Sequence, residues 1–274
     1  MILKKDTILI VGAGNMGFAF ISALLDNKIS PKQINIIEKK PTLKLKKISK
    51  AKKINLFKSI DELNIKTKIS ITLIAIKPNQ LDSLFTQEFN SKTKNSILIS
   101  IVAGKTMGTL KKLSGNNKDI ARAMTNTPVT VGFGTSIIYF SKTTTKTNKN
   151  KATHLLNLVG QVDEIKNEKH IDTFTALFGS GPAYLYLLIE IWTDLAKKYG
   201  LKNSEEMVIQ TMLGSLLLLL KTQDSPKSLR AGVTSKGGTT EAALAEFTKN
   251  NNLQKLFKTA VSKAIKRAGT LSKS

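Results

Sequence analysis

The fold of this chain is decided near its start, where residues 7–17 have the sequence Thr-Ile-Leu-Ile-Val-Gly-Ala-Gly-Asn-Met-Gly. Residues 7–11 form a continuous apolar run rich in β-branched side chains, which predicts a buried strand. From Phe18 to Leu25 the apolar residues recur at helical spacing, which predicts an amphipathic helix. The glycines between the two segments therefore indicate a strand, a tight turn and a helix in succession.

The turn has the spacing Gly12-x-Gly14-x-x-Gly17. Glycines in such a turn allow the bend, the close approach of a phosphate and the close contact of helix and strand, while N–H groups at the helix start hold a pyrophosphate. We therefore predict a dinucleotide-binding site that includes Asn15 and Met16 as well as the three glycines. An ordinary tight turn is the alternative.

The residues after the next strand bear on which dinucleotide is bound. This strand, predicted at residues 34–37, ends at Glu38 and is followed by Lys39 and Lys40. A carboxylate at this point accepts hydrogen bonds from the adenosine ribose and favours NAD, whereas lysines pair with a 2′-phosphate and favour NADP. Glu38 and Lys39 belong to the predicted cofactor site. The choice between NADPH and NADH stays open, with NADPH slightly favoured.

The rest of the chain divides into a mixed part and a helical part. Buried-strand patterns recur at residues 69–76, 97–102, 121–124, 136–140 and 162–165. Strands that alternate with helical stretches predict an α/β fold with a doubly wound, mostly parallel sheet. Long helical patterns follow at residues 171–178, 182–199, 204–220 and from 241 onward. We therefore predict a Rossmann-like dinucleotide-binding domain at residues 1–167 and an all-helical domain at residues 168–274.

The composition of two segments predicts whether they are exposed to solvent or buried. Residues 141–151 are a polar, low-complexity run of serine, threonine, lysine and asparagine, which predicts an exposed loop. Residues 207–220 form the longest apolar tract, but it is interrupted by polar residues and is shorter than the roughly 20 residues that cross a bilayer. We therefore expect a buried helix there, and no membrane association.

The composition excludes several classes of protein. The 274 residues include no cysteine and only two histidines, so disulfides, thiolate chemistry and a metal site are not expected. The formal net charge is +24, yet 40 of the 43 basic residues are lysines scattered along the chain. Arginine, which reads bases and phosphates with its planar fork, is almost absent, so no specific binding of nucleic acid is expected. With no targeting signal, the default is a cytoplasmic protein.

Further polar turns follow the predicted strands at the carboxyl edge of the sheet, where ligands bind in such folds. These turns contain Ile76-Lys77-Pro78, Ala103-Gly104 and Asn126. We predict that they contact the cofactor. The alternatives are a solvated lysine, structural packing of small residues, and a capped turn ahead of Pro128.

A second glycine-rich loop occurs in the helical part. Residues 235–240 have the sequence Ser-Lys-Gly-Gly-Thr-Thr and precede a helix expected from Glu241. Paired glycines and threonines at a helix start expose N–H and hydroxyl donors, which suit a carboxylate. A helix cap with a flexible loop is the alternative.

Together these motifs make the sequence similar to the pyrroline-5-carboxylate reductase family over nearly the whole chain. In the family's order they are Gly12–Gly17, Ile76–Pro78, Asn126–Pro128, Gly179–Tyr184 and Ser235–Thr240. The resemblance implies NAD(P)H-dependent reduction of the cyclic imine 1-pyrroline-5-carboxylate to L-proline, the last step of proline biosynthesis. It also implies a homodimer formed by the helical domains, which often assembles further into a ring.

The resemblance also implies residue roles. It puts the nicotinamide near Lys77, Pro78, Ala103 and Gly104, and the substrate carboxylate on the second loop. The implied substrate-binding residues are Ser235, Gly237, Gly238, Thr239 and Thr240. Thr239 is the expected catalytic residue, because its hydroxyl would lie nearest the imine nitrogen.

The chain departs from the family pattern at Lys236 and Thr125, where proline is usual, and at Ser70, where an acidic residue is usual. Lys236 either attracts the substrate anion or loosens the loop. The alternatives are a hydroxyacid dehydrogenase or imine reductase of the same two-domain plan, and a basic binding protein that has lost catalysis. A hydroxyacid dehydrogenase of the same plan would have a lysine on the helix that begins near Ala183, and residues 183–190 contain none. A basic binding protein without catalysis would have no need of the loop at residues 235–240, whereas Lys236 and the net charge of +24 favour it.

Overall fold

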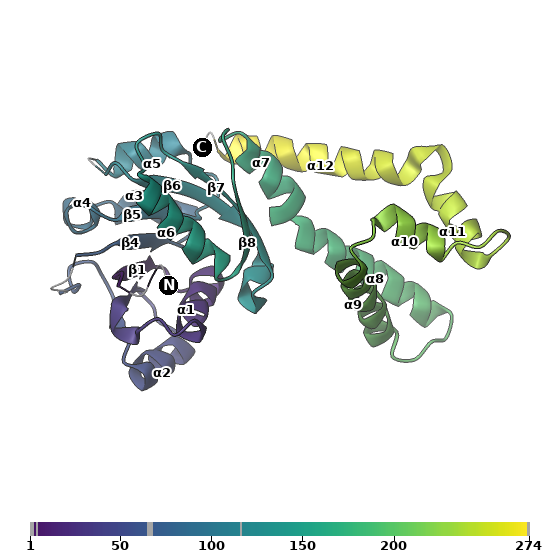
Figure 1. Ribbon diagram of the computed structural model, residues 1–274, viewed down its shortest axis with the longest axis horizontal. Helices are drawn as coiled ribbons and strands as arrows, with labels where there is room; N and C mark the ends of the chain where they lie inside the picture. Colours follow the sequence, from purple (N-terminus) through teal and green to yellow (C-terminus); the bar gives the residue numbers. More distant parts are fainter. Residues whose placement is uncertain (1–2, 4, 65–67, 116, 273–274) are drawn as a thin grey trace. The chain divides into compact units, whose positions relative to one another are not determined.

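A computed structural model describes residues 3, 5–64, 68–115 and 117–272. Within these residues the strands form one eight-stranded sheet in the order β3-β2-β1-β4-β5-β6-β7-β8 (Figure 1). The strands are β1 (Ile8–Val11), β2 (Ile34–Ile37), β3 (Asn55–Phe57), β4 (Ile71–Ile74), β5 (Ile97–Ser100), β6 (Ile120–Thr125), β7 (Gly134–Phe140) and β8 (Gly160–Glu164). Neighbouring strands are parallel except for β6 and β7. The predicted mostly parallel α/β sheet is confirmed.

Strand β1 shows why the sheet is buried on both faces. It pairs with β2 and β4 on its two sides, with Ile8 opposite Ile34 and Ile71. Successive side chains of a strand point to opposite faces. Accordingly Ile8 belongs to one hydrophobic cluster and Leu9 to the other. A continuous apolar run suits this position because no side chain of the strand meets water.

Helices cover the sheet in the first part of the chain. They are α1 (Asn15–Asp26), α2 (Leu43–Lys52), α3 (Leu81–Leu84), α4 (Gln87–Thr93), α5 (Met107–Leu113), α6 (Lys146–Asn157) and α7 (His170–Phe174). Threonine hydroxyls cap the starts of α2, α4, α5 and α6 by accepting a hydrogen bond from the backbone N–H three residues on. Such caps satisfy donors that the helix itself leaves free.

The loop predicted at residues 141–151 is wrong, because helix α6 begins within it. Thr145 caps the helix by accepting from Asn148 N, and Lys151 Nζ lies 2.5 Å from Asp6 Oδ1. The apolar residues that bury the helix, including Leu155, lie after the polar run. Ser141 is itself buried and donates to Lys118 O. Low complexity concealed a threonine cap followed by lysines, which are good helix formers.

The second part of the chain is helical, as predicted. Its helices are α8 (Gly181–Lys198), α9 (Ser204–Thr222), α10 (Pro226–Gly232), α11 (Thr239–Thr248) and α12 (Asn252–Leu271). The chain forms two compact units: one ends at Ser180 and includes the residues from Ile265 onward, and the other comprises Gly181–Ala264. These units divide the chain differently from the predicted domains, 1–167 and 168–274, which stay a prediction.

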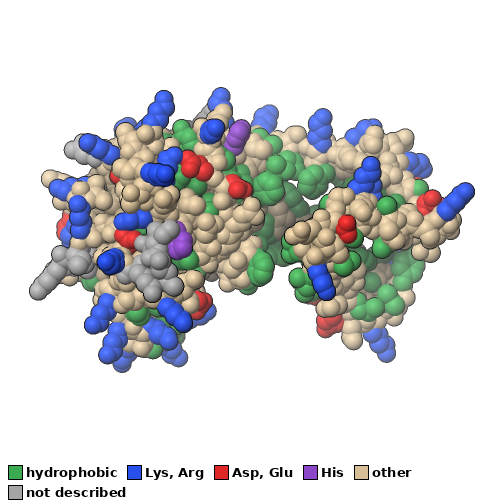
Figure 2. Space-filling view, viewed as in Figure 1, with side chains coloured by type: hydrophobic (Ala, Val, Ile, Leu, Met, Phe, Trp, Pro, Cys, Tyr) green, Lys and Arg blue, Asp and Glu red, His purple; other side chains and the backbone are tan. Residues whose placement is uncertain are grey.

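The helices of the second unit expose many large apolar side chains, which Figure 2 shows as hydrophobic surface over this unit. On α8, Trp192 is 45% exposed, and on α9, Leu217 is 55% exposed. The expectation that residues 207–220 form a buried helix is therefore wrong for the single chain.

By length and composition alone, one described helical segment, His170–Lys198, could cross a membrane, and few of its residues are buried. An apolar surface of this extent indicates a protein or membrane partner.

Candidate active site

The glycine turn between β1 and α1 has the geometry that its spacing predicts. Gly12 has φ +91°, and a Cβ there would lie 2.6 Å from Ala75 O. A Cβ at Gly17 would lie 2.0 Å from Gly12 O, so this glycine permits the close contact of helix and turn. A Cβ at Gly14 would meet no described atom within 4 Å. Gly14 is exposed at the start of α1, so the space beside it is open to a ligand.

Glu38 lies against this turn. Its Oε2 accepts a 2.8 Å hydrogen bond from Ala13 N, and its Oε1 accepts a 3.1 Å bond from Lys40 N. The carboxylate at the end of β2 therefore ties two backbone segments together. The side chains of Lys39 and Lys40 are exposed beside it.

The turn after β4 adjoins the glycine turn. A Cβ at Gly12 would lie 2.8 Å from Ile76 Cγ2, so the two turns are in direct contact. Lys77 and Pro78 follow and are exposed, and Lys77 N donates to Gln80 Oε1 over 3.2 Å. The structure thus brings the residues predicted from 12–17, Glu38 and 76–78 to one edge of the sheet.

Asn126, at the end of β6, has its side chain engaged with the backbone. Its Oδ1 accepts a 2.9 Å bond from Thr135 N, and its Nδ2 donates to Phe178 O over 3.2 Å. The side chain is 8% exposed. Asn126 therefore ties β7 and the π-helical turn Thr175–Gly179 to β6. A cofactor contact by Asn126 stays a prediction.

Ala103 and Gly104 lie in the loop between β5 and α5. Ala103 is exposed, and Gly104 has φ +70°. A cavity of about 40 Å³ adjoins the loop, and its lining also includes Arg122, Asp172 and Leu271. Its lining is mostly apolar, and a cavity of this size is too small for a nicotinamide ring. Within the lining, Ser272 Oγ donates to Asp172 Oδ1 over 2.8 Å.

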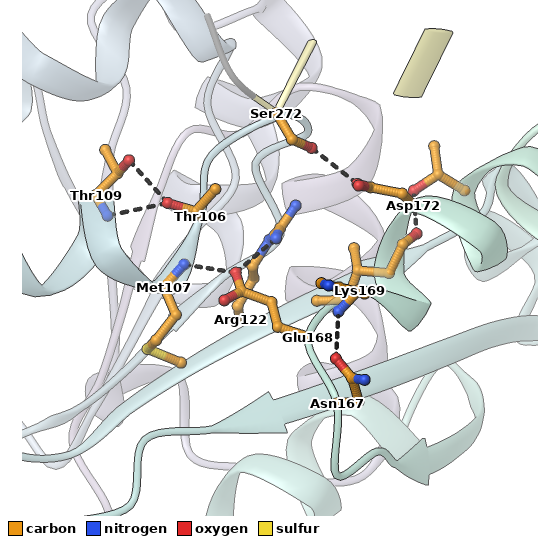
Figure 3. Close-up of polar contacts among 11 residues, drawn as sticks. Thr106, Met107, Thr109, Arg122, Asn167, Glu168, Lys169, Asp172 and Ser272 are labelled. Carbon is orange, nitrogen blue, oxygen red and sulfur yellow. Dashed lines mark hydrogen bonds and ion pairs between the residues drawn. The ribbon is translucent and has the colours of Figure 1, made fainter. Parts of the chain in front are cut away.

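Sequence reasoning missed an ion pair between a buried arginine and a partly buried glutamate next to this loop. Arg122 Nη1 lies 2.6 Å from Glu168 Oε1, and the Arg122 side chain is only 5% exposed. The same Oε1 accepts a 2.6 Å hydrogen bond from Met107 N, the first residue of α5 (Figure 3). The signal that could have found it is an arginine within a buried strand, because a buried charge requires a partner.

The loop at residues 235–240 belongs to the second unit and leads into α11. Gly237 has φ +74°, and Gly238 caps the helix while its N–H donates to Ser235 O over 3.0 Å. Gly237 N donates a 2.7 Å hydrogen bond to Glu241 Oε2. Ser235 and Thr239 are exposed. The loop thus already holds a carboxylate, supplied by its own helix, on one of its backbone donors.

No group of metal-ligating side chains occurs among the described residues.

Comparisons with known proteins agree with this architecture. Residues 7–104 match the family model described as NADP oxidoreductase coenzyme F420-dependent, and residues 168–271 match pyrroline-5-carboxylate reductase dimerisation. The chain is 32% identical over 250 residues to pyrroline-5-carboxylate reductase of Haemophilus influenzae, covering 89% of this chain and 90% of that protein.

Solved structures give the same result. A pyrroline-5-carboxylate reductase from Coxiella burnetii matches with a TM-score of 0.88 and 31% identity, covering 98% of this chain and 99% of that one. Plasmodium falciparum pyrroline carboxylate reductase with NADP bound matches with a TM-score of 0.82 and 28% identity, covering 98% and 99%.

A glycine turn in a parallel sheet, followed by a helical dimerisation region, defines a nicotinamide-dependent oxidoreductase with a Rossmann-like domain. More particularly, the chain belongs to the pyrroline-5-carboxylate reductase family. It catalyses the NAD(P)H-dependent reduction of 1-pyrroline-5-carboxylate to L-proline, the last step of proline biosynthesis. It forms a homodimer, and the apolar surface of α8 and α9 lies within the region that matches the dimerisation model.

Proposed function

We propose that the reduction is carried out by two groups of residues, one for the cofactor and one for the substrate. The cofactor group comprises the turn from Gly12 to Gly17, Glu38, Lys39, Ile76, Lys77, Pro78, Ala103, Gly104 and Asn126. The substrate group comprises Ser235, Gly237, Gly238, Thr239 and Thr240. The observation that carries the proposal is the open space at Gly14, at the start of α1.

The glycine turn fits a dinucleotide for a physical reason. The first N–H groups of α1 have no partner within the helix, and no side chain at Gly14 caps them. The partial positive charge of a helix start favours a pyrophosphate. Any residue other than glycine at position 14 would put a Cβ atom into the space that the phosphate needs. The residues present therefore fit a bound NAD(P)H.

The loop at residues 235–240 fits the carboxylate of the substrate. The Glu241 carboxylate, which lies 2.7 Å from Gly237 N, stands in for that group. The exposed hydroxyls of Ser235 and Thr239 supply further donors. A substrate carboxylate would replace Glu241 on Gly237 N and remain near the helix start.

The chain's own residues have a limited part in the chemistry. NAD(P)H supplies the hydride when it is bound. The substrate loop holds the pyrroline ring by its carboxylate and so orients the imine carbon for attack. Thr239 holds the proton on the imine nitrogen, which keeps that carbon electrophilic. The protein thus contributes position and hydrogen bonds rather than a covalent step.

We propose that Lys39 and Lys40 favour NADPH over NADH. Both are exposed next to Glu38, where a 2′-phosphate would lie. Replacing both lysines by alanine should raise the KM for NADPH and leave that for NADH unchanged. Lys52→Ala, on the exposed end of α2, is the matched control. An equal rise for both cofactors would show that the lysines do not read the phosphate.

The decisive experiment measures NADPH oxidation with 1-pyrroline-5-carboxylate for the wild type, Thr239→Ala and Thr248→Ala. Thr248 is an exposed threonine at the other end of α11, so it controls for loss of a hydroxyl from the same helix. We expect kcat to fall about 100-fold in Thr239→Ala and to stay unchanged in Thr248→Ala. Equal kcat values for all three proteins would remove Thr239 from the mechanism.

We also propose the domain boundaries, the higher assembly and the cellular location of the enzyme. The matched ranges 7–104 and 168–271 support the predicted domains at 1–167 and 168–274. The homodimer assembles further into a ring, which light scattering on the purified enzyme would measure as a mass above that of two chains. The enzyme is cytoplasmic, which fractionation of cells that express it would test.

A further inference from the structure

The loop at residues 101–106 is held at its start and in its middle. Ile101 N donates to Ile74 O over 3.1 Å, and Val102 N donates to Ser100 Oγ over 3.3 Å. In the middle, a Cβ at Gly104 would lie 2.9 Å from Leu271 O, so the last turn of α12 packs directly on the loop. The loop that contains Ala103 is therefore confined by its surroundings.

The end of the loop is held by Glu168, whose Oε1 accepts from Met107 N over 2.6 Å. The residues lie 61 positions apart in the sequence. Figure 3 shows the Glu168 side chain between Met107 and Arg122. A carboxylate at a helix start is favourable because the exposed N–H groups carry partial positive charge.

Arg122 determines where Glu168 can lie. The guanidinium is almost fully buried, and Nη1 lies 2.6 Å from Glu168 Oε1. A buried arginine without an anion is strongly unfavourable, so Glu168 is confined to this place. One carboxylate oxygen thereby joins the strand β6 to the start of α5 and to the loop that ends there.

We propose that Glu168 is a positioning residue for the reduction, which fixes the loop at residues 101–106 and through it the nicotinamide. The proposal rests on the cofactor site proposed above, in which Ala103 and Gly104 contact the nicotinamide. Glu168 itself does not touch the reacting atoms. Its effect should therefore appear in hydride transfer and not in the affinity for the dinucleotide, whose pyrophosphate is proposed to bind at the glycine turn.

The test compares Glu168→Ala and Glu168→Gln with the wild-type enzyme. Steady-state kinetics with 1-pyrroline-5-carboxylate give kcat, and calorimetry gives the Kd for NADP⁺. We expect Glu168→Ala to lower kcat about tenfold or more, because a small misplacement of reacting groups is costly. The Kd for NADP⁺ should not change. Glu168→Gln should recover part of kcat, because its amide oxygen can still accept from Met107 N.

The matched control is Glu164→Ala. Glu164 also forms a 2.6 Å ion pair, with Lys149, but its side chain is 49% exposed on β8 and belongs to no part of the proposed site. Its kcat should equal that of the wild type. If Glu168→Ala has the same kcat as Glu164→Ala, the positioning role is overturned.

A second variant covers the event that Glu168→Ala does not fold with Arg122 left unpaired. Arg122→Met with Glu168→Ala removes both charges of the ion pair, so no buried arginine is left unpaired. The folded double variant should show the same low kcat with unchanged Kd for NADP⁺. A double variant with wild-type kcat would overturn the proposal.

Ala103→Leu separates this proposal from the one on which it rests. Ala103 is exposed, so the larger side chain would disturb a ligand more than the fold. If Ala103→Leu changes neither kcat nor the KM for NADPH, the loop does not contact the nicotinamide and both proposals fail. If Ala103→Leu is impaired while Glu168→Ala is not, only the positioning role of Glu168 fails.

Discussion

Glu38 Oε2 accepts a 2.8 Å hydrogen bond from Ala13 N, which joins the end of β2 to the middle of the glycine turn. Its other oxygen accepts from Lys40 N. The position is the one at which a carboxylate binds the adenosine ribose in related folds. Here the same carboxylate also supports the loop that would surround the pyrophosphate.

Glu38→Ala should therefore raise the KM for NADPH and for NADH together, by about three- to tenfold, because a charge-assisted hydrogen bond to the turn is lost. Steady-state kinetics with each cofactor measure the two values. A rise confined to NADH would mean that Glu38 binds the ribose and that its bond to Ala13 is unimportant for the cofactor.

Two glycines of the turn should respond differently to alanine. Gly17→Ala puts a Cβ 2.0 Å from Gly12 O, so the free energy of unfolding should fall by about 1–3 kcal/mol. Gly14→Ala meets no described atom within 4 Å, so the protein should stay folded. Its methyl group should nevertheless raise the KM for NADPH about tenfold or more. Thermal unfolding and kinetics measure the two effects. If Gly14→Ala has the wild-type KM for NADPH, the pyrophosphate does not bind beside Gly14.

Glu241 competes with the substrate for Gly237 N, over a distance of 2.7 Å. Glu241→Gln should lower the KM for 1-pyrroline-5-carboxylate about two- to fivefold, because a negative charge leaves the helix start. The KM for NADPH should not change. Glu246→Gln, an exposed glutamate on the same helix, serves as the control. An increase in the substrate KM would instead make Glu241 part of the binding site.

The exposed side chains of α9 should maintain the homodimer. Leu217 is 55% exposed in the single chain, and Leu217→Glu would bury a charge in the dimer. We expect light scattering to show monomers or aggregates for this variant. Leu43→Glu changes a leucine of α2 that is 76% exposed, and it should remain a dimer. If Leu217→Glu remains a dimer, the interface does not include this part of α9.

Local patterns in the sequence predicted much of the fold. The predicted strand at residues 34–37 coincides with β2, and the predicted helix at 18–25 lies within α1. Short strand β3, with its three residues Asn55–Phe57, was not predicted, because its pattern is too brief. Helix α6 was missed because its polar first turn conceals the apolar residues that follow.

The apolar tract at residues 207–220 shows a different limit. Its helix was predicted, but its burial was not, because composition does not distinguish a core from a surface that a second chain covers. The single chain exposes Leu213 and Leu217, and the family match to a dimerisation region supplies the reason.

The sequence by itself determined the glycine turn, the mixed first part and helical second part of the chain, and the loop at residues 235–240. Each of these depends on residues close together along the chain, so backbone preferences and hydrophobic spacing are sufficient to find them. Only the tertiary structure decided that Glu168 meets Arg122 and Met107, and that Leu271 packs on Gly104. Those contacts exist because the order of strands in the sheet and the return of α12 bring distant segments together, and no local pattern records such pairings.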